Sequence, residues 1–538
     1  MSRRASRADQ RRGSVLNADN ALQAMGHKQE LKRNFSMISM LGLAFAILNS
    51  WTALSASLSL ALPSGGSTSV IWGLVTAGIC NLCLAVSLAE MLSAYPTAGG
   101  QYHFVAMIAW KRSVPILSWI TGWINVAGWI ALVASGGLLG SQLIVGLIAL
   151  FHTDYVAQPW HQFLIYICYN VIAFSINAFG TRLLPLITEG AFFWSITGFV
   201  VISITLLACS HGHYNTGTFV YGNFINETGW PDGIAWLLGL LQGGLGLTGF
   251  DAVAHMVEEI PDPTKEGPKI MIYCVLVGLF TGFIFLTVLL LVAGDIDDAI
   301  SSSAGPVLQI FYDATGSLAG STCLLLFPLV CLLFATITIM TTSSRMTYAF
   351  ARDGGLPWSR FFAKVHPKLD LPLNALYLTT GLTIIFGCIF LGSSSAFNAI
   401  ISASVVALGV SYAIPPAVHC LRGRNRLPED RWFKLPPVLG WAANLIGISY
   451  AILTTVLFVF PPELPVTGSN MNYCIVAFFI VLVIATLTWF FEGKGKYAGP
   501  KIDAAALQSG EVMGMAPDAA YYDDSKHVVD GEQGMKKD

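Results

Sequence analysis

The chain has 538 residues, of which 54% are apolar and only 11% are charged, and its mean hydropathy is +0.64. Soluble proteins carry about 25% charged residues, so this composition excludes a soluble enzyme, a nucleic-acid-binding protein and a secreted disulfide-stabilised domain. Apolar runs of about 20 residues recur along the chain, each long enough to cross the ~30 Å hydrocarbon core of a bilayer. The sequence therefore predicts an all-α polytopic membrane protein.

Polar segments flank the apolar part of the chain. Residues 1–36 are rich in Ser and Arg, and residues 492–538 are small, acidic and polar. Such compositions cannot bury enough apolar surface to fold, so both segments are predicted to be disordered tails. Because the first apolar run begins near residue 37, too late for a cleaved signal peptide, residues 37–491 are predicted to form one membrane domain.

Twelve apolar runs, bounded by charged residues, Pro and Gly, are predicted to be membrane-spanning helices. The third and eighth runs are long for one crossing, so each is predicted to be tilted or to extend into a loop. The approximate spans are 37–62, 69–93, 115–150, 162–180, 189–209, 234–256, 270–294, 317–350, 373–391, 396–421, 438–460 and 473–491.

The basic residues indicate the orientation in the membrane. With the N-terminus inside, all 29 Lys and Arg residues lie in the tails or at the inner ends of the spans, and the six outer connections contain none. Cytoplasmic loops of membrane proteins are enriched in Lys and Arg. Both termini are therefore predicted to be cytoplasmic. The plasma membrane is the expected location, with the vacuolar membrane left open.

The longest outer loop, about residues 210–233, contains a glycosylation sequon that begins at Asn226. Its place on the outer side predicts a glycan on Asn226. The sequence contains neither a nucleotide-binding P-loop nor an H-E-x-x-H zinc motif. We therefore expect no metal, no cofactor and no coupling to ATP hydrolysis.

The sixth run contains a cluster of glycines followed by a carboxylate. Residues 243–249 read Gly-Gly-Leu-Gly-Leu-Thr-Gly, and Phe250 and Asp251 follow. Each glycine weakens a helix by about 1 kcal/mol relative to alanine, so the cluster favours a break. A broken helix exposes backbone polar groups, which are tolerated in a membrane only where they face protein, a cavity or a ligand. A close helix contact through small residues is the alternative, and Asp251 favours a binding site.

The first run has a matching feature at residues 48–52, Leu-Asn-Ser-Trp-Thr. Asn and Ser side chains compete for backbone hydrogen bonds and weaken a helix. Interruptions five helices apart are typical of inverted-repeat transporters, whose binding site lies near the bilayer midplane. In the third run, Trp123 and Trp129 are candidates to line such a site.

Several longer motifs resemble those of a known family of transporters. They are A-E-M-L-S-A-Y-P-T-A-G-G-Q-Y at 89–102, F-D-A-V-A-H-M-V-E-E-I-P at 250–261, S-R-M-T-Y-A-F-A-R-D-G-G-L-P at 344–357, P-L-N-A at 372–375, and F-P-P-E-L-P-V-T with N-M-N-Y at 460–473. By these motifs the chain resembles the amino acid–polyamine–organocation superfamily, and within it the fungal amino acid/choline transporters. The resemblance covers about residues 35–490.

The resemblance implies the leucine-transporter-like fold. In that fold, two inverted five-helix repeats (here about 37–209 and 234–421) are followed by two C-terminal helices (here about 438–491). It also implies that substrate binds between the unwound middles of the first and sixth helices.

Carried over residue by residue, Asn49, Ser50 and Trp51 fall where the family binds a substrate carboxylate through backbone amides. Asp251 falls where a gating or ammonium-facing acidic residue can occur. The chain departs from the family pattern in two ways: Trp51 stands where many relatives have a small residue, and the fifth helix lacks the lysine of some proton-coupled relatives. The predicted substrate-binding residues are Asn49, Ser50, Trp51, Trp123, Gly246, Thr248, Gly249, Phe250 and Asp251.

The function that the resemblance implies is secondary active transport of a small amine-bearing solute of the amino acid, 4-aminobutyrate or choline type. The expected partners are this solute, a coupling proton and the lipid bilayer, without nucleic acid. The residues do not decide between these solutes. An exporter of a nitrogenous secondary metabolite and a non-transporting nutrient sensor are the alternatives. An enzyme is not expected, because Asp251 and His255 are the only residues within the predicted membrane spans that resemble a catalytic cluster.

Overall fold

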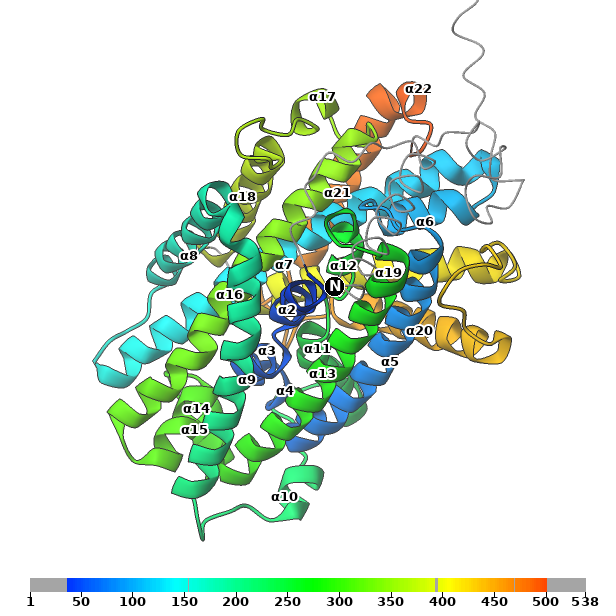
Figure 1. Cartoon of the computed structure of the whole chain (residues 1–538). Coiled ribbons are helices and arrows are strands. Elements are labelled where there is room, and N and C mark those ends of the chain that lie inside the picture. The colour runs from blue at the N-terminus through cyan, green and yellow to red at the C-terminus, as the bar shows by residue number, and fades with distance from the viewer. Residues whose placement is uncertain (1–35, 153, 392–394, 469, 501–538) are drawn as a thin grey trace, which may run out of the picture.

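The computed structural model describes residues 36–152, 154–391, 395–468 and 470–500. The predicted N-terminal tail, apart from Ser36, and most of the predicted C-terminal tail lie outside these residues. The described residues form helices and loops without a β-strand, and eleven of the helical segments are long and apolar enough to span a membrane. The structure thereby confirms an all-α polytopic membrane protein (Figure 1).

The first half of the bundle follows the predicted spans closely. The third predicted span is one continuous helix of 38 residues. At about 1.5 Å per residue its length is roughly 57 Å, which exceeds one perpendicular crossing. The helices are α2 (Met37–Leu48), α3 (Ser50–Ala56), α4 (Leu58–Ala61), α5 (Gly66–Ala94), α6 (Gln101–Ile108), α7 (Val114–Phe151), α8 (Pro159–Phe179), α9 (Leu184–Cys209) and α10 (Gly217–Gly222).

The second half contains the remaining spans and several short helices between them. A 3₁₀ turn, η3 (Val257–Glu259), continues the sixth predicted span inward. The helices are α11 (Asp232–Gly246), α12 (Ala252–His255), α13 (Pro263–Val292), α14 (Ile296–Ser301), α15 (Pro306–Thr315), α16 (Leu318–Arg352), α17 (Ser359–Phe362), α18 (Leu373–Gly387), α19 (Ala396–Leu421), α20 (Pro437–Leu457), α21 (Cys474–Thr488) and α22 (Lys494–Lys496).

The sixth predicted span, 234–256, is divided between two helices. Helix α11 has 15 residues and ends before the four-residue α12 begins. Its length is about 22 Å, and neither piece alone crosses a ~30 Å core. This is why the structure has eleven long apolar helices where the sequence predicts twelve spans. The count of twelve and the inverted repeat stay predictions.

The two interrupted segments lie in the interior of the bundle. Helices α2, α3, α11 and α12 occupy its middle in Figure 1, and they pack against α5, α7, α13 and α16. Small residues allow the close approaches: a Cβ atom at Gly128 of α7 would lie 2.8 Å from Leu408 of α19, and one at Gly136 would lie 2.8 Å from Thr336 of α16. Such contacts are the usual means of packing helices within a membrane.

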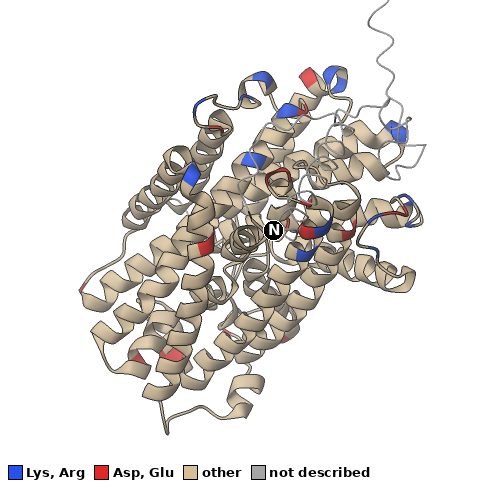
Figure 2. Ribbon diagram, in the orientation of Figure 1, with Lys and Arg blue, Asp and Glu red and all other residues tan. Residues whose placement is uncertain are grey.

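Lys and Arg residues gather toward one end of the molecule. In Figure 2 they lie in the upper half, around α17 and α22, whereas the opposite end around α14 and α15 shows only acidic residues. This polarity is that expected from the predicted orientation. The short helices α6, α10, α14, α15 and α17 were not among the predicted spans. Each is far shorter than the apolar run of about 20 residues that a crossing needs.

Asn226, the predicted glycosylation site, lies in the loop after α10, where its side chain closes a turn. Its Nδ2 donates to the carbonyl oxygen of Trp230 at 2.7 Å and to Oδ1 of Asp232 at 2.9 Å. Its Oδ1 accepts from the hydroxyl of Thr228 at 2.8 Å. A glycan replaces one Nδ2 hydrogen, so it would remove one of the first two bonds. Glycosylation of Asn226 stays a prediction.

Candidate functional site

The first predicted span breaks at a single residue. Helix α2 ends at Leu48, and Asn49 has φ 41° and ψ 41°, the left-handed conformation. Asn enters this conformation more readily than most residues. Helix α3 then begins anew at Ser50, so the interruption predicted at residues 48–52 is present.

The new start of α3 presents backbone donors in the middle of the bundle. The first hydrogen bond of this turn joins the N–H of Ala53 to the carbonyl oxygen of Asn49 at 2.8 Å. The N–H groups of residues 50–52 precede it, and such first-turn donors have no partner within their own helix. Nearby, Asn49 Nδ2 and Ser50 Oγ are buried and have no hydrogen-bond partner among the described residues. Unpaired donors at a helix N-terminus favour an anion.

The sixth predicted span breaks at the glycine cluster. Helix α11 ends at Gly246, and its last turn is tightened by bonds from the N–H groups of Leu247 and Thr248, each 3.3 Å long. Gly249 has φ +102°, a conformation that other residues rarely adopt, and a Cβ atom there would lie only 2.7 Å from Ile47. Gly249 is thus required both by its backbone conformation and by its contact with α2. The C-terminal carbonyls of α11 attract positive charge.

The two breaks lie against each other. Nε2 of Gln242 on α11 donates to the carbonyl oxygen of Leu54 on α3 at 2.6 Å. A Cβ atom at Gly246 would lie 2.6 Å from the Leu54 side chain, and Gly249 abuts Ile47 at the end of α2. A Cβ atom at Gly278 of α13 would lie within 3.3 Å of both Ser50, at the start of α3, and Leu247, at the end of α11. The two half-helix ends are therefore neighbours inside the membrane part of the protein.

Asp251 follows the second break and accepts hydrogen bonds from four elements. Its carboxylate is fully buried. Its Oδ1 accepts from the Tyr412 hydroxyl at 2.6 Å. Its Oδ2 accepts from Gln101 Nε2 at 2.7 Å, Trp129 Nε1 at 3.2 Å and Asn125 Nδ2 at 3.4 Å, and it is hydrogen-bonded to His255 Nε2 at 3.1 Å. This network ties α6, α7, α12 and α19 to the sixth-span break.

The predicted residues near the breaks are buried and close together, with one side chain directed elsewhere. Phe250 packs on Tyr412 with ring centroids 4.6 Å apart. Thr248 Oγ1 donates back to the Gly244 carbonyl oxygen at 2.7 Å. The Trp51 indole instead donates to Oγ of Ser195 on α9 at 2.8 Å and packs on Phe285 of α13. Only its backbone N–H therefore takes part in the α3 N-terminus.

Trp123 lies apart from both breaks. It lines an apolar groove of about 650 Å³ between α7, α18, α19 and α21. Trp129, six residues further along α7, is the tryptophan that reaches Asp251. The structure thus brings together eight of the nine predicted substrate-binding residues, counting Trp51 by its backbone, and leaves Trp123 elsewhere.

Three residues of the Asp251 network were not predicted from the sequence. Gln101 is part of the G-G-Q-Y motif, so its place between the second and third spans was a usable signal. Asn125 lies between the two tryptophans of α7 and also donates to Ser411 Oγ at 2.9 Å. Tyr412, in the tenth predicted span, gave no signal, because a tyrosine in an apolar run is common.

Two ion pairs lie next to this site, on the 3₁₀ turn η3 that follows α12. Nε of Arg345 lies 3.1 Å from Glu259 Oε1, and Arg352 Nη2 lies 3.1 Å from Glu258 Oε1. Glu258 Oε1 also accepts from the Ala98 N–H at 3.2 Å, in the segment before α6. These contacts join η3, α16 and the α5–α6 connection.

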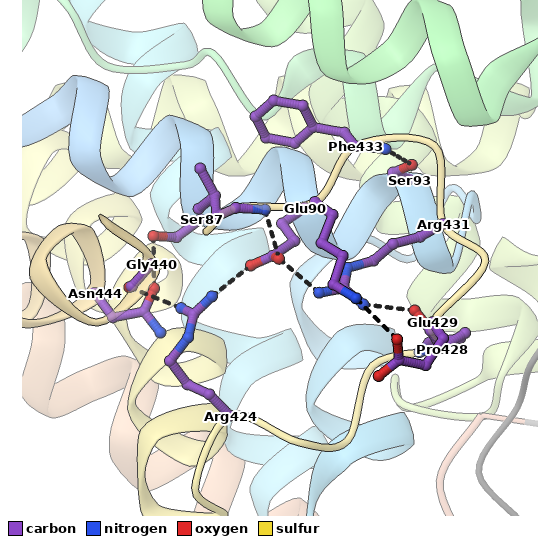
Figure 3. A network of polar contacts seen from close by, with 12 residues as sticks. Ser87, Glu90, Ser93, Arg424, Pro428, Glu429, Arg431, Phe433, Gly440 and Asn444 are labelled. Atoms are coloured by element: carbon purple, nitrogen blue, oxygen red, sulfur yellow. Dashed lines mark hydrogen bonds and ion pairs between the residues drawn. The ribbon is translucent and has the colours of Figure 1, made fainter. Parts of the chain in front are cut away.

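A second ionic cluster, shown in Figure 3, joins α5 to the connection between α19 and α20. The carboxylate of Glu90, 1% exposed, accepts from Arg424 Nη2 at 2.7 Å and from Arg431 Nη2 at 2.8 Å. The N–H of Leu435 donates to it at 3.0 Å. Arg424 also donates to the carbonyl oxygen of Gly440. Glu90 therefore has a structural environment, away from the two breaks.

The bundle of membrane-spanning helices, with two interrupted helices in contact at its centre, defines a membrane transporter of small solutes. The sequence profile of the amino acid permease family matches residues 35–484. The chain belongs to this family, within the amino acid–polyamine–organocation superfamily.

Its relatives are permeases and transporters, not enzymes. The chain is 33% identical to the choline transporter of Saccharomyces cerevisiae, over 87% of this chain and 83% of that protein. It is 34% identical to an uncharacterised amino-acid permease of Schizosaccharomyces pombe and 31% identical to amino-acid permease 2 of Neurospora crassa, in both cases over 90% of each chain. The resemblance found in the motifs is thereby confirmed.

Proposed function

We propose that the protein is a proton-coupled transporter of a small amine-bearing solute that works by alternating access. The observation that carries this proposal is that α3 and α11 pack against each other inside the bundle, with Ser50 at the start of α3 and Leu247 at the end of α11 both next to Gly278 of α13. A solute with a carboxylate and an ammonium group fits such a pair of half-helix ends. Its carboxylate would face the N–H groups of residues 50–52, and its ammonium group would face the carbonyls at residues 246–247.

A quaternary ammonium solute such as choline is the second candidate. It has no carboxylate, and it is recognised through aromatic faces. Phe250, Tyr412 and Trp129 surround the sixth-span break with such faces. The similarity to the choline transporter of yeast supports this candidate.

The closed surroundings of the breaks support alternating access. Asn49, Ser50, Trp51, Thr248 and Asp251 are all 3% exposed or less. The ion pairs of Arg345 and Arg352, here called the inner-end ion pairs, join α16 to η3, the turn that directly follows α12. Solute therefore reaches the site only when one side opens, and both sides open in turn.

Labelled-solute uptake tests this function in cells that lack their own amine permeases. Choline, 4-aminobutyrate, a basic amino acid and a polyamine are compared at two external pH values and with a protonophore. We expect saturable uptake of one solute that rises in acid and collapses with the protonophore. Sodium-dependent uptake that resists the protonophore would contradict proton coupling.

The same experiment separates the alternatives. Absence of uptake of every solute, from protein shown to be at the cell surface, would favour an exporter or a nutrient sensor. Loaded vesicles would then distinguish efflux from no flux. We also propose that both termini are cytoplasmic and that the protein lies in the plasma membrane. A tag at each terminus that is reached by antibody only after permeabilisation tests this placement.

A further inference from the structure

The sixth-span break carries a buried carboxylate–imidazole pair. Nε2 of His255 lies 3.1 Å from Oδ2 of Asp251, one helical turn away, and both side chains are fully buried. Nδ1 of His255 lies 2.9 Å from the carbonyl oxygen of Ala98. Because a backbone carbonyl can only accept, Nδ1 carries a hydrogen in this arrangement.

The other partners of Asp251 indicate which atom carries the hydrogen between Asp251 and His255. The indole N–H of Trp129 can only donate, and it donates to Oδ2. The Tyr412 hydroxyl accepts from the N–H of Gly249 at 3.1 Å, so its own hydrogen points to Oδ1. Both carboxylate oxygens thus accept hydrogen bonds from neutral donors, an arrangement that favours the ionised form of Asp251. Nε2 of His255, which faces this carboxylate, therefore carries the second imidazole hydrogen.

We propose that the Asp251–His255 pair is the proton-binding site of this transporter, with the transported proton held at His255 Nε2. This inference rests on the proposed proton-coupled function. When the proton leaves to water, His255 becomes a neutral imidazole with its hydrogen on Nδ1, and Asp251 stays ionised. The charge of the pair then changes from zero to −1.

The charge change connects proton binding to movement of the helices. After proton release the buried carboxylate keeps its neutral donors but loses the charge of the imidazolium, and burying a net charge is unfavourable, so the closed form favours the protonated pair. Opening at the inner end would bring water to the pair, because Glu258 and Glu259 of the inner-end ion pairs follow His255 by three and four residues. Proton release and inner opening therefore favour each other.

The titratable groups that face the pair from neighbouring helices are few. Tyr412 of α19 donates to Asp251, and the Cys274 thiol of α13 interacts with it electrostatically. Helix α2 contains no titratable side chain. The arginines of α16 are engaged by Glu258 and Glu259, and His103 of α6 lies 2.9 Å from Asp353. From α6 and α7, Gln101, Asn125 and Trp129 contribute only uncharged donors. Among the described residues, His255 is thus the basic side chain that contacts Asp251 directly.

The experiment compares net transport with exchange in liposomes that contain the purified protein. Labelled choline and labelled 4-aminobutyrate are the probes. Net accumulation is driven by a pH gradient, with about pH 5 outside and about pH 8 inside. Exchange is measured without a gradient, against unlabelled solute inside. We expect His255→Gln to lose gradient-driven accumulation and to keep exchange, because the variant carries solute without a titrating proton.

The controls keep each outcome decisive. His419→Gln changes a buried histidine of α19 whose ring nitrogens have no hydrogen-bond partner among the described residues, and it is expected to keep both activities. Where His255→Gln does not purify as a monodisperse protein, His255→Asn replaces it, with the same expectation, because its side-chain amide can still donate toward the Ala98 carbonyl oxygen.

Each contrary result overturns a different statement. Full gradient-driven accumulation by the His255 variant would remove the proton site from this pair. Loss of exchange as well, in monodisperse protein, would show that His255 serves solute movement itself and would also overturn the assignment. Wild-type protein that exchanges a probe but never accumulates it under the gradient would contradict the proposed proton coupling instead.

Discussion

The hydroxyl of Tyr412 donates to Oδ1 of Asp251 across 2.6 Å while it accepts from the backbone N–H of Gly249 at 3.1 Å. One side chain of α19 thus holds both the carboxylate and the unwound backbone of the sixth-span break. Helix α19 also packs on α7 and α20. The geometry of the break therefore depends on a tyrosine that lies 161 residues from Asp251 in the sequence.

Replacing Tyr412 by Phe tests this relationship. The change leaves a buried carboxylate oxygen and a buried N–H without a partner, and each such loss costs about 1–3 kcal/mol. We expect lower stability and a large loss of transport at normal surface level. Tyr166→Phe is the matched control, since this buried tyrosine donates to the Thr383 carbonyl oxygen on α18, away from the breaks. The relationship is refuted if both variants transport equally well.

Gly249→Ala tests the backbone of the break. Alanine pays about 1–2 kcal/mol for a left-handed conformation, and its Cβ would collide with Ile47 at 2.7 Å. We expect a lower unfolding temperature in detergent and loss of uptake. Gly409→Ala in α19 is the control, because a Cβ atom there meets nothing within 4 Å. That control should gain up to about 1 kcal/mol from the better helix propensity of alanine.

Glu90→Gln tests the ionic cluster between α5 and the α19–α20 connection. Removing one partner of a buried ion pair costs about 3–5 kcal/mol, since the opposite charge stays buried. We expect a marked drop in the unfolding temperature of the purified protein. Glu429→Gln is the control, because it removes the exposed partner of Lys434 at 2.9 Å, and exposed pairs contribute little to stability. Equal shifts for the two variants would show that the cluster is not structural.

The two tryptophans of α7 should differ in function. Trp129→Phe removes a donor to Asp251, so we expect reduced solute uptake with an altered dependence on external pH. Trp123→Phe changes only the wall of the apolar groove, and uptake at wild-type levels is expected. If uptake is lost in the Trp123 variant and kept in the Trp129 variant, Trp123 would belong to the substrate site, as the sequence predicts.

The spans and both breaks could be predicted because they depend on local sequence. An apolar run of about 20 residues favours a spanning helix, and helix-weakening residues within the run interrupt it. Asn49 and the glycines at 243–249 weaken the helix in which they lie. In the structure, Asn49 adopts the left-handed conformation and Gly249 has a positive φ. Each lies in a segment where the sequence predicts a break.

The partners of Asp251 could not be predicted in the same way. Gln101, Asn125 and Tyr412 come from three segments at least 126 residues distant in sequence from Asp251. Which face of α7 points inward depends on how that helix packs, so two tryptophans six residues apart on different faces could not be told apart. The short helices between spans escaped prediction because they lack an apolar run.

The arginines of α16 have a consequence for the proposed opening of the inner end. Arg345 and Arg352 are two turns apart on one rigid helix, and their partners Glu259 and Glu258 are adjacent in one short turn. Neither pair can separate far without straining the other, so the two are expected to break together. The inner end is then expected to have two states, with both ion pairs formed or both broken. Distances between labels on η3 and α16 should therefore fall into a short and a long population, without an intermediate one.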